Sequence, residues 1–342
     1  QIVLTMSTIL HRKPAFPRVY LLAALRLVIT LQIHDILPGT SVAAVYRYAE
    51  SEYRDVHRAL GLLRRDAVSR IASRIDTSDC DHSLVVVNPT GTRFRGAVTA
   101  TLPVVGVLHD SQGTEVPSVL SSGDSSEVLF WTELPPFGYR TYSVEPATAS
   151  STVDANVPYA EAAVVEVGSF RLALSNRTGD IDELVDLRDG RILLAAGSNA
   201  LSLWDEHEQA TSWVSVLDAE RDDVTVVSPP RVIEENGIRT VVETVSESRY
   251  SRFVRRIVLY PRHERIDFEL DLEWAEPAAF LKLLFRSRDP VSHVVSGLPY
   301  GHEAVSHTSG EFLVQRWVRL SDSSIVVMND GAYGSDVCDG VY

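Results

Sequence analysis

The periodicity of apolar residues changes once along the chain, and this change constrains the fold more than any other feature. From Pro17 to about Ile75 apolar residues recur at helical intervals, whereas beyond residues 76–79 they alternate with polar ones. Alternation with a period of two is typical of strands that bury one face. The sequence therefore predicts a helical segment followed by a long β-rich region without intervening long helices.

A helix-turn-helix is predicted with His34 at its junction. The first helical run ends at His34, beside Asp35, and the segment 38–41 (Pro-Gly-Thr-Ser) supplies a turn and a candidate N-cap. The second run then shows helical spacing in Val42, Val45, Tyr46, Ala49, Tyr53, Val56 and Leu60. A single His-Asp pair at a helix end is, on its own, more often a cap or a surface pair than a ligand set.

The β-rich region divides into two units. The first runs from about Ser83 to Pro146 and is followed by a linker rich in Ala, Ser and Thr. In the second unit, five apolar residues alternate with four acidic ones, namely Ile266, Phe268, Leu270, Leu272 and Trp274 with Asp267, Glu269, Asp271 and Glu273. We predict an α+β, mainly β fold: a helical segment at 1–76, a small β-sandwich at 77–150 and a large antiparallel β-sandwich at 151–342.

Charge and cysteine content exclude several classes of function. The formal net charge of -14 gives no basic surface for nucleic acid, and it suits a neutral substrate. Cys80 and Cys338 show no metal-binding or disulfide spacing, so a reducing, cytoplasmic location is expected. The apolar stretch 19–31 is interrupted by Arg26 and shorter than the roughly 20 residues of a membrane-spanning helix. A secretory signal is the minor alternative, since basic residues precede that stretch but no cleavage site follows it.

Other candidate residues have simpler structural interpretations. His302 and His307 are expected in a surface loop without metal, because their separation suits neither helix nor strand coordination. The four acidic residues of 267–273 are expected to form the solvated face of a strand. Four tryptophans could stack on sugar rings but are expected in the core, namely Trp204, Trp213, Trp274 and Trp317.

The segment 32–41 (Gln-Ile-His-Asp-Ile-Leu-Pro-Gly-Thr-Ser) resembles the His-Asp-Ile-Leu-Pro-Gly-Thr/Ser string of glycoside hydrolase family 38 α-mannosidases. Further strings follow in the family's order, at 134–142, 298–301, 315–318 with 320–322, and 329–330 with 333–334. The resemblance spans residues 24–337, with departures at Leu31, Ile33 and Arg319. It implies that the large β-sandwich is galactose mutarotase-like.

The resemblance also implies which chemistry belongs to this chain. It makes His34 one of four zinc ligands and Asp35 a contact to hydroxyls of the mannose at the cleaved bond. The other ligands, an Asp nucleophile and an Asp acid/base would come from an N-terminal α/β domain, so no catalytic residue is assigned here. Zn²⁺ would orient the sugar while two carboxylates about 5 to 5.5 Å apart carry out the retaining displacement.

The expected partners are a mannose-containing oligosaccharide and that catalytic domain, without nucleic acid or membrane. The chain is expected to be a fragment at both ends, and a homo-oligomer stays open. Two alternatives remain beside the enzyme part: a carbohydrate-binding or scaffold module, and a free mutarotase-like sandwich. The helical segment with His34 argues against the last, because a free sandwich has no use for a metal ligand at its edge.

Overall fold

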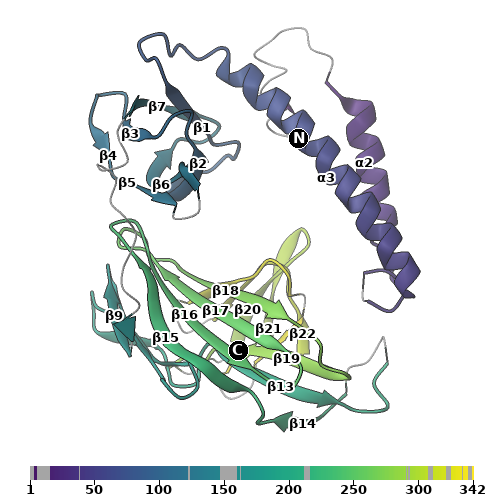
Figure 1. Cartoon of the computed structure of the whole chain (residues 1–342). Coiled ribbons are helices and arrows are strands. Elements are labelled where there is room, and N and C mark those ends of the chain that lie inside the picture. The colour runs from purple at the N-terminus through teal and green to yellow at the C-terminus, as the bar shows by residue number, and fades with distance from the viewer. Residues whose placement is uncertain are drawn as a thin grey trace. The chain divides into compact units, whose positions relative to one another are not determined.

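The computed structural model describes residues 4–5, 16–37, 39–121, 124–146, 160–161, 163–211, 216–289, 291, 293–306, 311–320, 325–332, 334–337 and 341–342. Among these, strands predominate and the paired strands of every sheet are antiparallel (Figure 1). The mainly β fold class is thereby confirmed. The chain divides into two compact units, residues 1–154 with 211–214 and residues 155–210 with 215–342.

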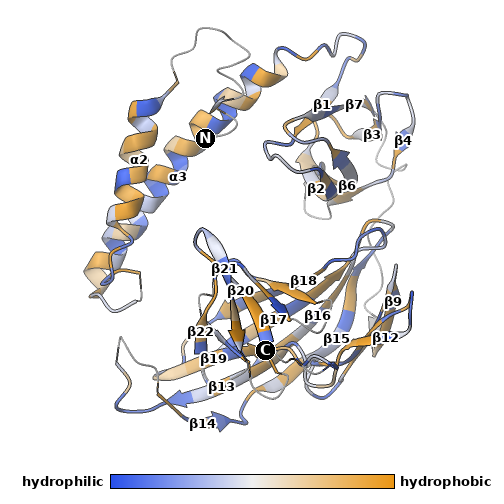
Figure 2. Ribbon diagram, turned by 180° about the vertical axis from the view of Figure 1, so that it is seen from behind, coloured by the Kyte–Doolittle hydropathy of each residue, from blue (hydrophilic) through white to orange (hydrophobic). Residues whose placement is uncertain are grey.

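Two helices form the predicted helix-turn-helix, α2 (Arg18–Thr30) and α3 (Ala43–Ala72). One face of α3 is buried at Ala49, Val56, Ala67 and Ile71, whereas α2 buries none of its residues although most are apolar (Figure 2). The prediction of an N-cap within 38–41 was wrong: Val42 occupies that position without a side-chain cap. No helix among the described residues combines the length and the apolar character needed to cross a membrane.

The small sandwich of the first unit has two antiparallel sheets. One has the order β1 (Ser83–Val87), β7 (Tyr139–Pro146), β3 (Gly106–His109), β4 (Glu115–Val116). The other has the order β2 (Phe94–Thr101), β6 (Asp124–Leu134), β5 (Ser118–Ser121). Apolar side chains of both sheets form one core, in which the rings of Phe130 and Tyr142 meet edge to face at 5.2 Å. Each fully buried side chain of this kind contributes roughly 1.5 to 3 kcal/mol.

The second unit contains the remaining strands. Its largest sheet has the order β18 (Ile266–Glu273), β17 (Arg252–Leu259), β16 (Thr240–Glu247), β15 (Thr225–Glu235), β8 (Ala160–Glu161). A second sheet has the order β12 (Arg191–Leu194), β11 (Ile181–Asp186), β10 (Phe170–Leu174), β9 (Val164–Val167). A third has the order β14 (Leu217–Arg221), β13 (Ala200–Glu206), β19 (Ala279–Leu284).

Two further sheets complete this unit. One has the order β21 (Gly301–Ser306), β20 (His293–Leu298), β23 (Trp317–Leu320), β24 (Val326–Met328). The other pairs β22 (Glu311–Leu313) with β25 (Gly334–Asp336). Apolar residues from β10, β11, β16 and β17 share one core, and residues around β20 and β23 form a second.

A buried arginine joins the loops of the second unit to its largest sheet. Arg255 of β17 is 2% exposed, and its Nη1 donates to Asp180 Oδ1 at 2.8 Å and to the carbonyl of Asn199 at 2.6 Å. Its Nη2 donates to the carbonyl of Thr178 at 2.6 Å. Gly179 adopts φ +71°, and a Cβ there would lie 2.7 Å from that Nη2, so the loop requires glycine at this position. The arginine thus fixes residues 178–180 and 199 to the sheet.

The expectation that tryptophans lie in the core was wrong for the described ones. Trp204 and Trp317 are half-buried, Trp274 is 38% exposed, and Trp213 lies outside the described residues. The apolar face of 266–274 is only partly covered, with Leu272 41% exposed, because β18 is the edge strand of its sheet. The acidic face is solvated as predicted at Glu269, Asp271 and Glu273. The fourth acidic residue, Asp267, is only 23% exposed, because Tyr260 and Arg265 both bond to its carboxylate.

Candidate functional site

The loop between α2 and α3 carries the candidate residues His34 and Asp35. Leu31, the first residue after α2, is buried and anchors the start of the loop. The amides of Ile36 and Leu37 both donate to the carbonyl of Ile33 at 3.0 Å, which closes a tight turn around the two candidates. Gly39 follows with φ +85°, a conformation that glycine adopts without strain. Pro38 lies outside the described residues.

The backbone of this loop is held by the first turn of α3. The carbonyl of Asp35 accepts hydrogen bonds from Ser41 Oγ at 2.5 Å and Tyr46 Oη at 3.4 Å. Tyr46 Oη lies 3.3 Å from the carbonyl of Ile36 and accepts from the Ser41 amide at 2.9 Å. Ser41 therefore fixes the loop rather than capping the helix.

The side chains of His34 and Asp35 point into solvent beside each other. They are 69% and 63% exposed, and Nε2 of the imidazole lies 3.4 Å from Oδ1 of the carboxylate. Neither α2 nor α3 has a side-chain cap at its N-terminus, so Asp35 caps no helix in this structure. A fixed backbone with exposed polar side chains suits contacts to a group outside the described chain.

The described residues do not complete a metal site by themselves. Within the described residues no group of three or more His, Cys, Asp or Glu side chains could hold a metal ion. Zinc in proteins takes about three to four protein ligands, so His34 with Asp35 supplies too few. His302 lies on strand β21 and is exposed, so the expectation of a surface loop was wrong for it, while His307 lies outside the described residues.

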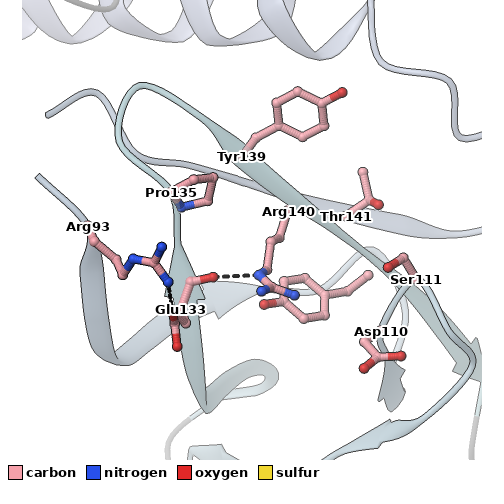
Figure 3. Close-up of a pocket in the computed structure, with 9 residues that line it drawn as sticks. Arg93, Asp110, Ser111, Glu133, Pro135, Tyr139, Arg140 and Thr141 are labelled. Carbon is pink, nitrogen blue, oxygen red and sulfur yellow. Dashed lines mark hydrogen bonds and ion pairs between the residues drawn. The ribbon is translucent and has the colours of Figure 1, made fainter. Parts of the chain in front are cut away.

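A polar pocket opens on the small sandwich, and the sequence did not single it out as a site. Its volume is about 420 Å³, within the usual range for ligand pockets. The side chains that line it come from the residue before β2, the end of β6 and the residue after it, β7, and the turn after β3 (Figure 3): Arg93, Glu133, Pro135, Tyr139, Arg140, Thr141, Tyr142, Asp110 and Ser111.

Ion pairs hold the charged wall of this pocket. Arg93 pairs with the carboxylate of Glu133, and Arg140 Nε donates to the Glu133 carbonyl (Figure 3). Arg95 pairs with the same carboxylate. The hydrogen bond from Arg93 is the main reason why the pKa of Glu133 lies below its usual value. Asp110 accepts from the amides of Gln112 at 2.8 Å and Thr114 at 3.0 Å. Both carboxylates are therefore engaged, which leaves hydroxyls, Tyr139 and the end of Arg140 to meet a ligand.

A buried asparagine shapes the rim. Asn88 Nδ2 donates to the carbonyls of Thr92 at 2.8 Å and Pro135 at 2.9 Å, joining two turns. Its Oδ1 accepts from the Thr90 amide at 3.0 Å. The only sequence signal for the pocket was Tyr139 and Arg140 directly after the turn 135–138, and both are exposed in the structure. The sequence did not show which distant loops lie next to each other.

Comparison with known proteins shows which fold and family this chain resembles. None of the curated proteins matches the chain. The chain is similar to the crystal structure of an alpha-mannosidase from Enterococcus faecalis V583, with a TM-score of 0.81 at 13% identity, over 100% of this chain and 48% of that chain. At that identity the likeness shows the fold, and the chain spans about half the length of that protein. The sequence model of the glycosyl hydrolases family 38 C-terminal domain matches residues 165–341. The chain therefore belongs to glycosyl hydrolase family 38.

Proposed function

We propose that this chain is the non-catalytic half of a zinc-dependent retaining α-mannosidase that removes terminal mannose from oligosaccharides. The observation that carries the proposal is the exposed His34–Asp35 pair on a fixed loop, in a chain whose whole length matches half of a solved α-mannosidase. In this proposal a segment corresponding to the other half supplies both catalytic carboxylates.

His34 and Asp35 have separate roles in the proposal. His34 contributes one imidazole nitrogen to a zinc site whose other ligands lie outside this chain. Asp35 accepts hydrogen bonds from mannose hydroxyls, and its exposed carboxylate is placed for that contact. A bound zinc ion would act as a Lewis acid that positions the sugar. The Ser41 and Tyr46 contacts to the loop backbone keep both side chains oriented before a ligand binds.

The apolar surface of α2 supports a partner domain. Val19, Tyr20, Leu25 and Ile29 are all exposed, and no residue of this helix is buried. Several exposed apolar side chains on one short helix mark an interaction surface rather than a stable solvated face. We infer that the α/β catalytic domain of the mannosidase covers it.

The test compares the chain alone with the chain joined to a family 38 α/β domain. Hydrolysis of an aryl α-mannoside in the presence of Zn²⁺ is the measurement. We expect turnover only from the joined protein, since the bond-breaking carboxylates are proposed to lie in the α/β domain. Turnover by the chain alone that a substitution within residues 1–342 removes would contradict the proposal.

The pocket of the small sandwich favours a second candidate, a carbohydrate-binding module. Hydroxyls, an aromatic ring and a guanidinium around about 420 Å³ can bind a neutral, hydroxyl-rich ligand. Titration of the chain with mannose oligosaccharides, followed by ligand-observed NMR, tests this function. Tyr139→Ala should abolish the signal if the pocket binds sugar, while Tyr53→Ala on α3 serves as the exposed control.

A further inference from the structure

Arg140 brings a positive charge to the pocket of the small sandwich that no described carboxylate neutralises. The residue is exposed on β7, and its Nε donates to the carbonyl of Glu133, which carries no charge. Within the described residues its guanidinium forms no ion pair, and its two Nη atoms make no hydrogen bond. A guanidinium with both Nη atoms available can form two parallel hydrogen bonds to one oxyanion.

The charges at this pocket leave a surplus of one positive charge. Three guanidiniums lie at the pocket or against its wall, those of Arg93, Arg95 and Arg140. They face only two carboxylates, those of Glu133 and Asp110. Glu133 is shared, because Arg93 pairs with its Oε1 and Arg95 with its Oε2 at 3.2 Å. The whole chain carries a formal net charge of -14, so this surplus is a local attraction for anions on an acidic protein.

Buried contacts fix the frame around Arg140. Tyr142, which follows on β7 and also lines the pocket, is 4% exposed, and its Oη lies 2.6 Å from Oγ1 of the buried Thr132. Buried Asn88 holds another lining residue, since its Nδ2 donates to the carbonyl of Pro135 at 2.9 Å. A site that is formed before its ligand arrives loses less conformational freedom on binding.

The turn after β3 adds a hydroxyl to the pocket. Ser111 lies in this turn and lines the same cavity as Arg140 (Figure 3). Its hydroxyl makes no hydrogen bond within the part of the chain that the structure describes. A serine hydroxyl can donate one hydrogen bond to an anion or accept one from a ligand hydroxyl.

We propose that this pocket binds a small oxyanion, with the Arg140 guanidinium on its carboxylate or phosphate group and Ser111 on another of its oxygens. An acidic sugar and free inorganic phosphate both carry this chemistry. An anion is favoured over the neutral ligand of the carbohydrate-binding candidate, because only an anion adds an ion pair to the two hydrogen bonds of the guanidinium. The proposal involves neither the His34 loop nor the hydrolase function.

The experiment titrates the whole chain and follows the arginine side-chain Nε–Hε resonances by NMR. The probes are D-glucuronate, its neutral counterpart D-glucose, and inorganic phosphate. Glucuronate or phosphate should bind, and glucose should bind at least tenfold more weakly than the bound anion. Arg140→Gln removes the free charge and should weaken anion binding at least tenfold. Ser111→Ala should weaken it about 2- to 10-fold, the usual effect of one hydrogen bond.

Arg58→Gln is the matched control, since Arg58 is an exposed arginine on α3 of the same unit. It should keep full affinity, and the thermal midpoints of all variants show whether they are folded. Binding of either anion supports the proposal, and the tighter of the two identifies an acidic sugar or free phosphate as the ligand.

Four results would overturn the proposal. They are no binding of either anion, glucose binding as tightly as glucuronate, full anion affinity in Arg140→Gln, and an equal loss of affinity in Arg58→Gln. The second of these would assign the pocket to neutral sugars. The measurement needs neither zinc nor turnover, so its failure leaves the hydrolase proposal standing. An inactive joined protein with intact anion binding would contradict only the hydrolase proposal.

Discussion

Nε2 of His34 lies 3.4 Å from Oδ1 of Asp35 on a loop whose backbone is tied to the next helix. The two residues are consecutive in sequence, yet both side chains extend from the same surface into solvent. An exposed histidine beside a carboxylate stabilises the fold little, because solvent screens the interaction. Substitutions at either residue should therefore separate effects on function from effects on stability.

His34→Ala should release or weaken zinc in the protein that joins this chain to a family 38 α/β domain, and it should abolish turnover. Loss of one imidazole leaves the site short of a ligand. The chain alone should bind zinc no better than about micromolar, since a single neutral imidazole is a small part of a site. Metal content after dialysis measures both effects. Full zinc retention with normal turnover would make His34 purely structural.

Asp35→Asn should lower kcat/KM of the joined protein by about 10- to 100-fold, the usual loss when a hydrogen bond to a charged group is weakened. Its thermal stability should stay unchanged, because Asp35 caps no helix. A capping role would give the opposite result on Asp35→Ala, with about 0.5 to 2 kcal/mol of stability lost and kinetics spared. Steady-state kinetics and thermal denaturation of the same samples distinguish the two.

Polar substitution on α2 should prevent association with an α/β domain. The double variant Leu25→Glu with Ile29→Glu places charges on the exposed apolar face, and sedimentation of the mixed domains reports binding. Stability of the chain should change by no more than about 0.5 kcal/mol, as expected for surface sites. Leu313→Glu, at an exposed apolar residue of β22, is the control and should leave association intact.

Asp180→Ala should destabilise the second unit strongly. It leaves the guanidinium of Arg255, which is 2% exposed, without its carboxylate partner. Removal of one partner of a buried ion pair costs about 3 to 5 kcal/mol. Asp55→Ala breaks the exposed pair with Arg58 on α3 and should cost no more than about 0.5 kcal/mol. Urea denaturation of the two variants gives the comparison, and equal effects would show that the Arg255 cluster contributes nothing special.

Low pH should lower the stability of the second unit, because it protonates Asp186. Hydrogen bonds from the Arg188 side chain and then its amide lower the pKa of Asp186 from 3.8 to about 2. A carboxylate with a lowered pKa stabilises the fold fully above its unfolded value and loses that contribution as pH falls through the folded value. Stability should decline between about pH 4 and pH 2. Asp186→Asn should flatten that part of the profile, which thermal denaturation across this pH range measures.

Periodicity predicted much of the secondary structure. The two helical runs and the alternating strand of 266–273 appear where helical spacing and alternation placed them. These features are local, since each depends on which face of one element is apolar. The exposure of Trp274 and Leu272 could not be predicted from the local sequence. It depends on which strand lies at the sheet edge, and the sequence of β18 does not contain that information.

The candidate sites also differ in how far the local sequence predicts them. His34 and Asp35 are adjacent and were visible in the sequence, and their geometry follows from one turn. The pocket brings Arg93 to Glu133, and this contact depends on strand register.

Tyr46 lies eleven residues after Asp35, yet its hydroxyl lies against the carbonyls of Asp35 and Ile36. The orientation of the loop is therefore decided by a residue that touches no proposed ligand. Inherited or engineered substitutions in the first turn of α3 should impair function as much as a substitution of His34 does. A survey confined to ligand-contacting residues would overlook them.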